Sequence, residues 1–123
     1  MLHHISLGVT DLQRAARFYD AALAPLGYVR VWADGTAVGY GDPGGEDKLA
    51  IKLRAGAHPG GEGFHLALAA PSREAVAGFH RAALANGGTD NGAPGLRPHY
   101  GPKYFAAFVV DPDGHPIEAV INA

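Results

Sequence analysis

The sequence predicts an α+β fold in which two β-α-β-β-β modules form one cupped mixed sheet with the helices on its outside. An internal repeat, alternating apolar residues in strands and apolar residues at helical spacing support this fold class. Residues 4–27 match residues 65–88 at a constant offset of 61, with nine identities in 24 positions and no gap. Ordinary residue frequencies would give about two or three identities. The excess indicates two copies of one supersecondary unit.

The first copy reads as strand, helix and three strands. Residues 2–9 place Ile5, Leu7 and Val9 on one face of a strand. Residues 10–13 resemble a capping box, and apolar residues at helical spacing follow until Pro25 and Gly27 end the helix. The three expected strands lie at residues 28–33, 36–41 and 48–54.

The second copy follows a Gly- and Pro-rich linker at residues 55–63. A strand is expected at 64–70, and Ser72 is expected to cap a helix that runs to about Asn86. Residues 89–102 are rich in Gly, Pro and Asn, which predicts a long loop with at most a short strand. The last strands are expected at 103–111 and 116–122, joined by a turn at 111–114. The chain is thus interpreted as a single domain, 1–123, with repeats at about 1–55 and 63–123.

Composition narrows the functional classes. The 123 residues carry a formal charge of −2 with both signs scattered along the chain, which argues against a nucleic-acid partner. No apolar run is long enough for a membrane span and the start lacks a signal-peptide pattern, so we expect a cytoplasmic protein without a membrane partner. The absence of cysteine leaves imidazole and carboxylate as the strong metal donors. A small-molecule substrate is the expected partner.

A candidate metal site follows from the repeat. His4 and His65 are equivalent, and a pseudo-two-fold would bring both imidazoles to the floor of the cup among small residues. Alternation in the last strand turns Glu118 towards the same face. Two histidines and one carboxylate are a common donor set for a divalent transition ion with open coordination positions. We expect one such ion, and the donors suit Zn, Ni, Fe and Mn alike.

Three segments carry a family resemblance: HHISLGVTDLQRAARFYDAAL, FHLALAA and FVVDPDGHPIEAV. They resemble the vicinal oxygen chelate superfamily, which includes glyoxalase I, bleomycin-resistance proteins, extradiol dioxygenases and fosfomycin-modifying enzymes. The resemblance implies paired modules and metal ligands at His4, His65 and Glu118. It places Lys52 at the remaining ligand position, a glutamate in glyoxalase I, and a protonated lysine cannot ligate a metal.

The resemblance favours a metal-dependent enzyme whose substrate chelates the ion through neighbouring oxygens, with lyase, isomerase or dioxygenase chemistry. The ion would act as a Lewis acid that stabilises an enolate or oxyanion. The alternative is a non-catalytic protein that sequesters a planar compound, like the bleomycin-resistance proteins. Members of the family commonly pair, so we expect a homodimer.

Further candidates surround the ligands. Glu118, Tyr104 and His99 are the candidate catalytic residues, because a tyrosine or histidine near a metal can act as a general acid or hold a substrate oxygen. Lys52 and Tyr100 are candidate pocket residues, although loop aromatics often only pack and a lysine often only lies along an apolar edge. The other histidines are expected to be ordinary: His3, His58, His80 and His115.

Overall fold

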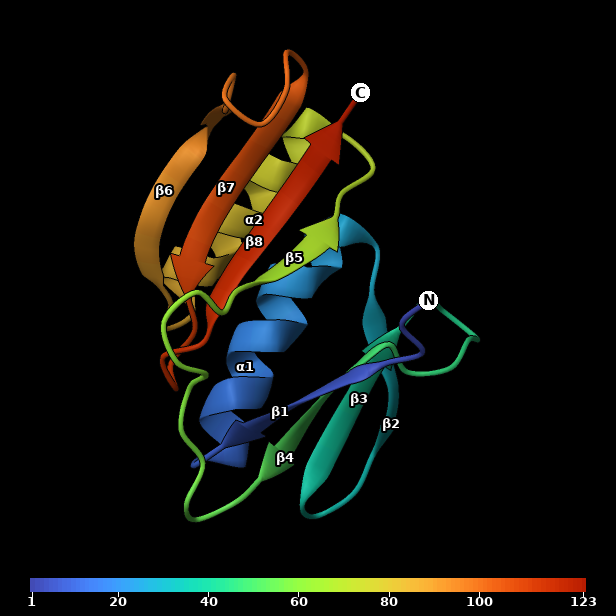
Figure 1. Cartoon of the computed structure of the whole chain (residues 1–123). Coiled ribbons are helices and arrows are strands. Elements are labelled where there is room, and N and C mark those ends of the chain that lie inside the picture. Colours follow the sequence, from blue (N-terminus) through green and yellow to red (C-terminus); the bar gives the residue numbers. More distant parts are fainter.

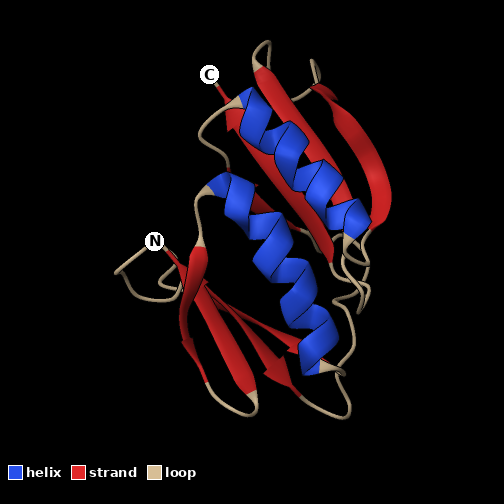
Figure 2. Ribbon diagram, turned by 180° about the vertical axis from the view of Figure 1, so that it is seen from behind, coloured by secondary structure: helices blue, strands red, loops and turns tan.

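The computed structural model describes all residues 1–123 and contains two four-stranded mixed sheets, each covered on one side by a helix (Figures 1 and 2). The α+β class and the paired modules are therefore confirmed. Module 1 consists of β1 (Ile5–Val9), α1 (Leu12–Leu23), the 3-10 turn η1 (Ala24–Leu26), β2 (Val29–Ala33), β3 (Ala37–Gly41) and β4 (Leu49–Leu53). Module 2 consists of β5 (Leu66–Ala69), α2 (Arg73–Ala85), β6 (Thr89–Leu96), β7 (Tyr104–Val110) and β8 (Pro116–Asn122).

The two modules share one topology. The strand orders are β1-β4-β3-β2 and β5-β8-β7-β6, with the first strand parallel to the last and the other pairs antiparallel. Strands β1 and β5 begin 61 residues apart, as do α1 and α2, which is the offset of the sequence repeat. Strand β1 and strand β5 each hydrogen-bond on one side only, so each module has a free edge at its first strand.

The helix starts follow the sequence with one correction. Asp11, rather than Thr10, caps α1: its Oδ1 accepts a hydrogen bond of 3.0 Å from the Arg14 N–H. Ser72 caps α2 as predicted, with Oγ accepting a 3.0 Å bond from the Ala75 N–H. The capping box was expected from the Thr-x-x-Gln spacing, but Thr10 instead takes part in a contact with the other module.

The segment after α2 differs from its expected loop. It forms β6, which pairs with β7 through two irregular steps, between Asp90 and Gly92 and between Gly92 and Gly95. Because β6 is an edge strand, Pro94 can lie in it without removing a required ladder hydrogen bond. Glycine and proline therefore mark an irregular edge strand here rather than a loop.

One hydrophobic cluster of 21 buried residues extends through both modules. Helices α1 and α2 pack against each other behind the sheets, which Figure 2 shows from the helix side. Phe18 of α1 and Phe79 of α2, which are equivalent in the repeat, are both fully buried. No helix is long and apolar enough to cross a membrane.

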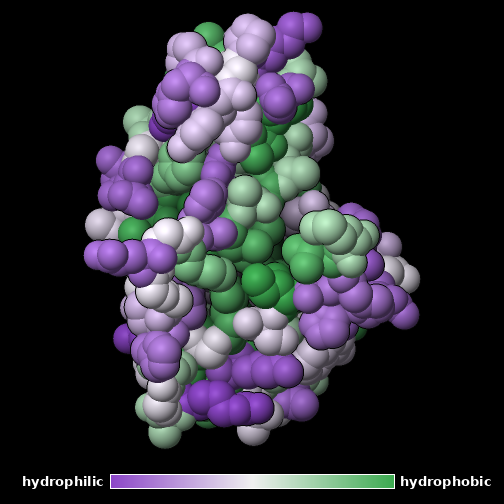
Figure 3. Space-filling model, viewed as in Figure 1, coloured by the Kyte–Doolittle hydropathy of each residue, from purple (hydrophilic) through white to green (hydrophobic).

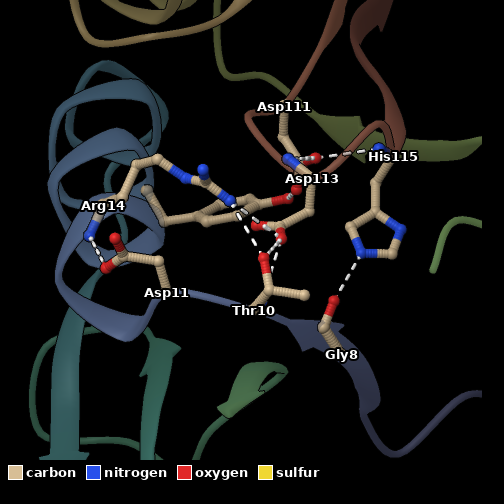
Figure 4. Close-up of polar contacts among 8 residues, drawn as sticks. Gly8, Thr10, Asp11, Arg14, Asp111, Asp113 and His115 are labelled. Carbon is tan, nitrogen blue, oxygen red and sulfur yellow. Dashed lines mark hydrogen bonds and ion pairs between the residues drawn. The ribbon is translucent and has the colours of Figure 1, made fainter. Parts of the chain in front are cut away.

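A polar contact, here called the inter-module clasp, joins the turn before β8 to module 1 (Figure 4). Asp113 Oδ1 accepts hydrogen bonds from the Thr10 N–H and hydroxyl, both at 2.9 Å, and from the Arg14 guanidinium at 3.1 Å. His115 Nε2–H donates to the Gly8 carbonyl at 2.7 Å. His115, which the sequence predicts to be an ordinary residue beyond a turn, is 3% exposed and connects the turn before β8 with β1.

Asp111 orders the turn that carries the clasp. Its Oδ1 accepts from the N–H groups of Asp113 and His115 at 2.9 and 2.8 Å, and its Oδ2 accepts from the Tyr19 hydroxyl at 2.6 Å. Burial raises the pKa of Asp111 and, with this carboxylate beside it, raises the pKa of Tyr19 well above its usual value. Three protein donors therefore compensate a carboxylate that is 3% exposed.

Candidate metal and substrate site

Three side chains from module 2 meet on the sheet face opposite α2. Glu118 of β8 pairs with Ala67 of β5, so it shares a face with His65, two residues before Ala67. His65 Nε2 lies 3.0 Å from Glu118 Oε1, and the Tyr104 hydroxyl donates to Glu118 Oε2 at 2.6 Å. Of the three predicted metal ligands, His65 and Glu118 are thus brought together within one chain.

Glu118 is a buried carboxylate on a face of mostly small or apolar residues. It is 1% exposed, whereas the side chain of His65 is 52% exposed. Burial and the hydrogen bond to Glu118 raise the pKa of Tyr104 to about 12. The phenol therefore stays protonated at neutral pH and acts as a hydrogen-bond donor to Glu118. A buried carboxylate is costly unless positive charge or hydrogen bonds compensate it, so a cation beside His65 fits this arrangement.

His4 lies apart from this pair. It is exposed, precedes β1 by one residue, and its Nδ1 lies 2.8 Å from Nδ1 of His3. No group of three or more His, Asp or Glu side chains in one chain could hold a metal ion. The donor types at His65 and Glu118 fit a divalent transition ion, but one chain assembles two of the three expected ligands.

The strand registers revise the place of Lys52. Ser6 pairs with Ala50 in module 1 as Ala67 pairs with Glu118 in module 2, so Ala50 is the equivalent of Glu118. Lys52 pairs with Gly8, two residues further along β4, and is half-buried. Lys52 shares the open face with Ala50 but does not occupy the position of the missing carboxylate.

The same cross-strand row differs between the modules. From first to last neighbour in the sheet order, the row in module 1 is Ser6, Ala50, Gly39 and Trp32. In module 2 it is Ala67, Glu118, Phe108 and Gly92. In both rows an aromatic ring covers a glycine of the neighbouring strand. In module 1 the ring is Trp32 of the edge strand β2, and a Cβ at Gly39 of β3 would meet its indole. In module 2 the glycine is Gly92 of the edge strand β6, and a Cβ there would meet the Phe108 ring of β7. Both open faces thus present a flat aromatic surface, and no sequence pattern predicted that of Phe108.

The remaining predicted residues form an aromatic chain that leads away from Glu118. The Tyr104 ring centroid lies 5.2 Å from that of Tyr100, which lies 4.2 Å from that of His99. Tyr100 and His99 are exposed. Tyr104 is therefore the one additional candidate that contacts a predicted ligand.

The site is an open face rather than a cavity in a single chain. None of the four cavities is lined by His65, Tyr104 or Glu118. Figure 3 shows apolar side chains gathered on the sheet side of the molecule, over the junction between the modules. Trp32 and Phe64 are among the large apolar residues that remain more than a third exposed.

Comparison with known proteins decides the family. The profile of the Glyoxalase/Bleomycin resistance protein/Dioxygenase superfamily matches residues 1–119. The chain belongs to this superfamily. A glyoxalase/bleomycin resistance protein from Albidiferax ferrireducens T118 is 36% identical and superimposes with a TM-score of 0.81, over 95% of this chain and 94% of that one.

Other members of the glyoxalase superfamily show the same fold. A glyoxalase-related enzyme from Fulvimarina pelagi is 26% identical, with a TM-score of 0.76 over 99% of this chain and 88% of that one. A glyoxalase I mutant from Zea mays is 24% identical, with a TM-score of 0.68 over 97% of this chain and 45% of that longer one. A sequence comparison with curated proteins finds no significant match.

Proposed function

We propose that this superfamily member is a divalent-metal-dependent enzyme for a small substrate that chelates the ion through neighbouring oxygens. The buried Glu118 carboxylate, 3.0 Å from His65 on an open sheet face, carries the proposal. His65 and Glu118 are the ligands from one chain, and His4 is the third. Zn, Ni, Fe and Mn all suit this donor set.

The third ligand comes from a second copy of the chain in this proposal, which makes the protein a homodimer. The module 2 face is open, the first strand of each module has a free edge, and apolar side chains lie exposed over the junction (Figure 3). Such a surface is costly in water and typical of an interface. In the proposed dimer His4 of each chain reaches His65 and Glu118 of the other, and the two-fold symmetry gives two such sites.

The chain's own residues have distinct roles. When bound, the metal would supply Lewis acidity to the substrate oxygens. Tyr104 holds one oxygen of Glu118 by its hydroxyl, which fixes the carboxylate and leaves Oε1 facing His65. Because its hydroxyl is the donor in this bond, Tyr104 is proposed to position the carboxylate. In this proposal Tyr100, His99 and Lys52 lie at the rim of the substrate space.

The ligand residues of this chain favour some reactions of the superfamily over others. The resemblance assigns glyoxalase I a further carboxylate that takes part in proton transfer, and this chain has Ala50 at the equivalent position. Hemithioacetal isomerisation would then lack its base, so the three-ligand ion favours chemistry like that of the extradiol dioxygenases or the fosfomycin-modifying enzymes. The second candidate function, sequestration of a planar compound without turnover, draws its support from the flat surfaces of Trp32 and Phe108.

Calorimetric titration with Zn²⁺, Ni²⁺ and Mn²⁺, and with Fe²⁺ under anaerobic conditions, tests the metal site. The variants His65→Ala, Glu118→Ala and His4→Ala should each lose stoichiometric binding while their melting temperatures stay near that of the wild type. His80→Ala is the matched control, because His80 forms a similar pair with Asp90 at 2.8 Å elsewhere on the chain. Unchanged affinity in any of the first three variants would remove that residue from the site, and a metal-free wild type that binds planar compounds would favour sequestration.

A further inference from the structure

Arg97 is a fixed guanidinium beside the candidate metal ligands. Its Nη1 donates to the Gly95 carbonyl at 2.9 Å and its Nη2 to the Ala93 carbonyl at 2.7 Å, so the side chain folds back along the preceding strand, β6. Its central carbon lies 5.3 Å from the centroid of the Phe108 ring. Two hydrogen bonds and a stacked ring therefore hold the group in place before any ligand arrives.

The guanidinium lies on the same face as the candidate metal ligands. Phe108 pairs directly with Glu118, and its ring centroid is 6.4 Å from that of His65. Because directly paired residues point to one face of a sheet, Arg97, Phe108 and the two ligands form a continuous surface. The Phe108 ring thus neighbours both the Arg97 guanidinium and the His65 imidazole.

No carboxylate neutralises Arg97. Arg14 pairs with Asp113 and Arg30 with Asp20, whereas no acidic oxygen lies within 4.0 Å of Arg97. Its two carbonyl bonds occupy two of the five N–H donors of a guanidinium, and three remain. A preorganised arginine with free donors is a typical receptor for an oxyanion such as a carboxylate or a phosphate-like group.

Two glycines of β6 leave the space that the guanidinium occupies. A Cβ at Gly92 would lie 3.2 Å from Arg97 Nη2 and 3.0 Å from Phe108 Cδ1, and one at Gly95 would lie 3.3 Å from Arg97 Nη1. Gly92 also has φ +150°, which side-chain-bearing residues rarely adopt. The glycine pattern that suggested a loop thus makes room for this arginine.

We propose that Arg97 binds an oxyanion of the substrate, a carboxylate or a phosphonate, carried on the same small molecule whose neighbouring oxygens chelate the metal. The inference rests on the proposed function and specifies its substrate class: a chelating molecule with a separate acidic group and a flat portion that lies on Phe108.

Binding of matched chelators to the metal-loaded protein tests this assignment. Catechol has the two neighbouring oxygens alone, 2,3- and 3,4-dihydroxybenzoate add a carboxylate at two positions, and 3,4-dihydroxyphenylphosphonate adds a phosphonate. The wild type should bind at least one acidic probe about tenfold or more tightly than catechol, as expected for hydrogen bonds between charged groups. Comparing the carboxylate with the phosphonate identifies the preferred oxyanion.

Arg97→Gln should abolish that preference, with a much smaller change in the affinities for catechol and for the metal. Arg73→Gln is the matched control, since Arg73 stacks on Phe105 of the same strand at 5.0 Å but on the helix side. It should keep the preference, and melting temperatures check that both variants fold.

The outcomes separate the two claims. A protein that binds metal and catechol but shows no preference for the acids, or an Arg97→Gln variant that keeps the preference, overturns the role of Arg97 alone. A wild type that binds no metal overturns the proposed function and this inference with it.

Discussion

The two modules have the same fold but different chemical content, and the candidate metal ligands follow that difference. Across the equivalent row of each sheet, module 2 has Glu118 where module 1 has Ala50. A histidine lies two residues before the first member of the row in both modules, His4 before Ser6 and His65 before Ala67. Module 2 therefore offers two donors and module 1 offers one. A site with three ligands needs the open face of one module 1 and the open face of one module 2.

The hairpin turns show a second difference. The turn before β8 contains Asp111, which is buried and ordered by three hydrogen bonds, and it carries the clasp to module 1. The turn before β4 begins with the same Asp-Pro dipeptide, but Asp42 is exposed and has only a backbone turn bond. The same local sequence thus carries the inter-module clasp in one module and forms a solvent-exposed turn in the other.

Disrupting the turn that carries the inter-module clasp should have the largest effect on stability. Asp111→Ala leaves two buried N–H groups and the Tyr19 hydroxyl without their acceptor, which should cost about 2–3 kcal/mol of unfolding free energy. Asp42→Ala, the equivalent change in module 1, should cost less than about 0.5 kcal/mol. Urea denaturation measures both, and equal losses would contradict the contrast between the turns.

The pH dependence sharpens this contrast. Burial raises the pKa of Asp111, so the folded chain holds its proton to a higher pH than the unfolded chain does. Its contribution to stability is then greatest below its ordinary pKa of about 4 and falls as the pH rises through the raised value. The wild type should gain stability relative to Asp111→Asn as the pH is lowered from 7 to 4. Parallel melting curves across that range would show that this group does not titrate differently on folding.

A carboxylate at position 50 would give the open face of module 1 the ligand that Glu118 provides in module 2. Ala50→Glu should raise metal affinity about tenfold by adding a fourth ligand, while lowering the stability of the metal-free protein because Ala50 is buried. Lys52→Glu, two residues along the strand, is the control and should not raise the affinity. A larger gain from Lys52→Glu would show that the register does not set the ligand position.

The contact between Gly39 and Trp32 predicts the smallest effect on stability. Gly39→Ala places a Cβ against the Trp32 indole, which is 38% exposed and can swing outwards. The expected cost is about 1 kcal/mol, with a red shift of tryptophan fluorescence. Gly35→Ala in the neighbouring turn, where a Cβ would meet nothing within 4 Å, should leave the emission unchanged. An unshifted Gly39→Ala spectrum would place the indole elsewhere.

The sequence was most informative where the repeat is strict. The offset of 61 gave the strand and helix that begin each module, and alternation gave the inward face of β8 and hence Glu118. The later strands have diverged by insertions, so register was needed to show that Ala50, not Lys52, matches Glu118. Contacts between distant segments, such as His115 with Gly8, leave no local pattern.

Other features were hidden because one residue type serves several purposes. Glycine and proline in β6 suggested a loop, whereas they form an irregular edge strand with space for Arg97. Thr10 matched a capping pattern, yet its hydroxyl binds Asp113 across the modules. The separation of His4 from His65 depends on the orientation of the two sheets relative to each other, and neither the repeat nor the alternation of apolar residues specifies that orientation.

Complementation between two inactive chains tests the shared metal site most directly. His4→Ala and Glu118→Ala chains are co-expressed with different tags, and the mixed dimers are purified and titrated with Zn²⁺. A site shared between chains gives one intact set of ligands in each mixed dimer, from His4 of one chain and His65 with Glu118 of the other. The account predicts one ion per mixed dimer and none in either parent dimer. Mixed dimers that bind no ion, while the wild-type dimer binds two, would contradict it.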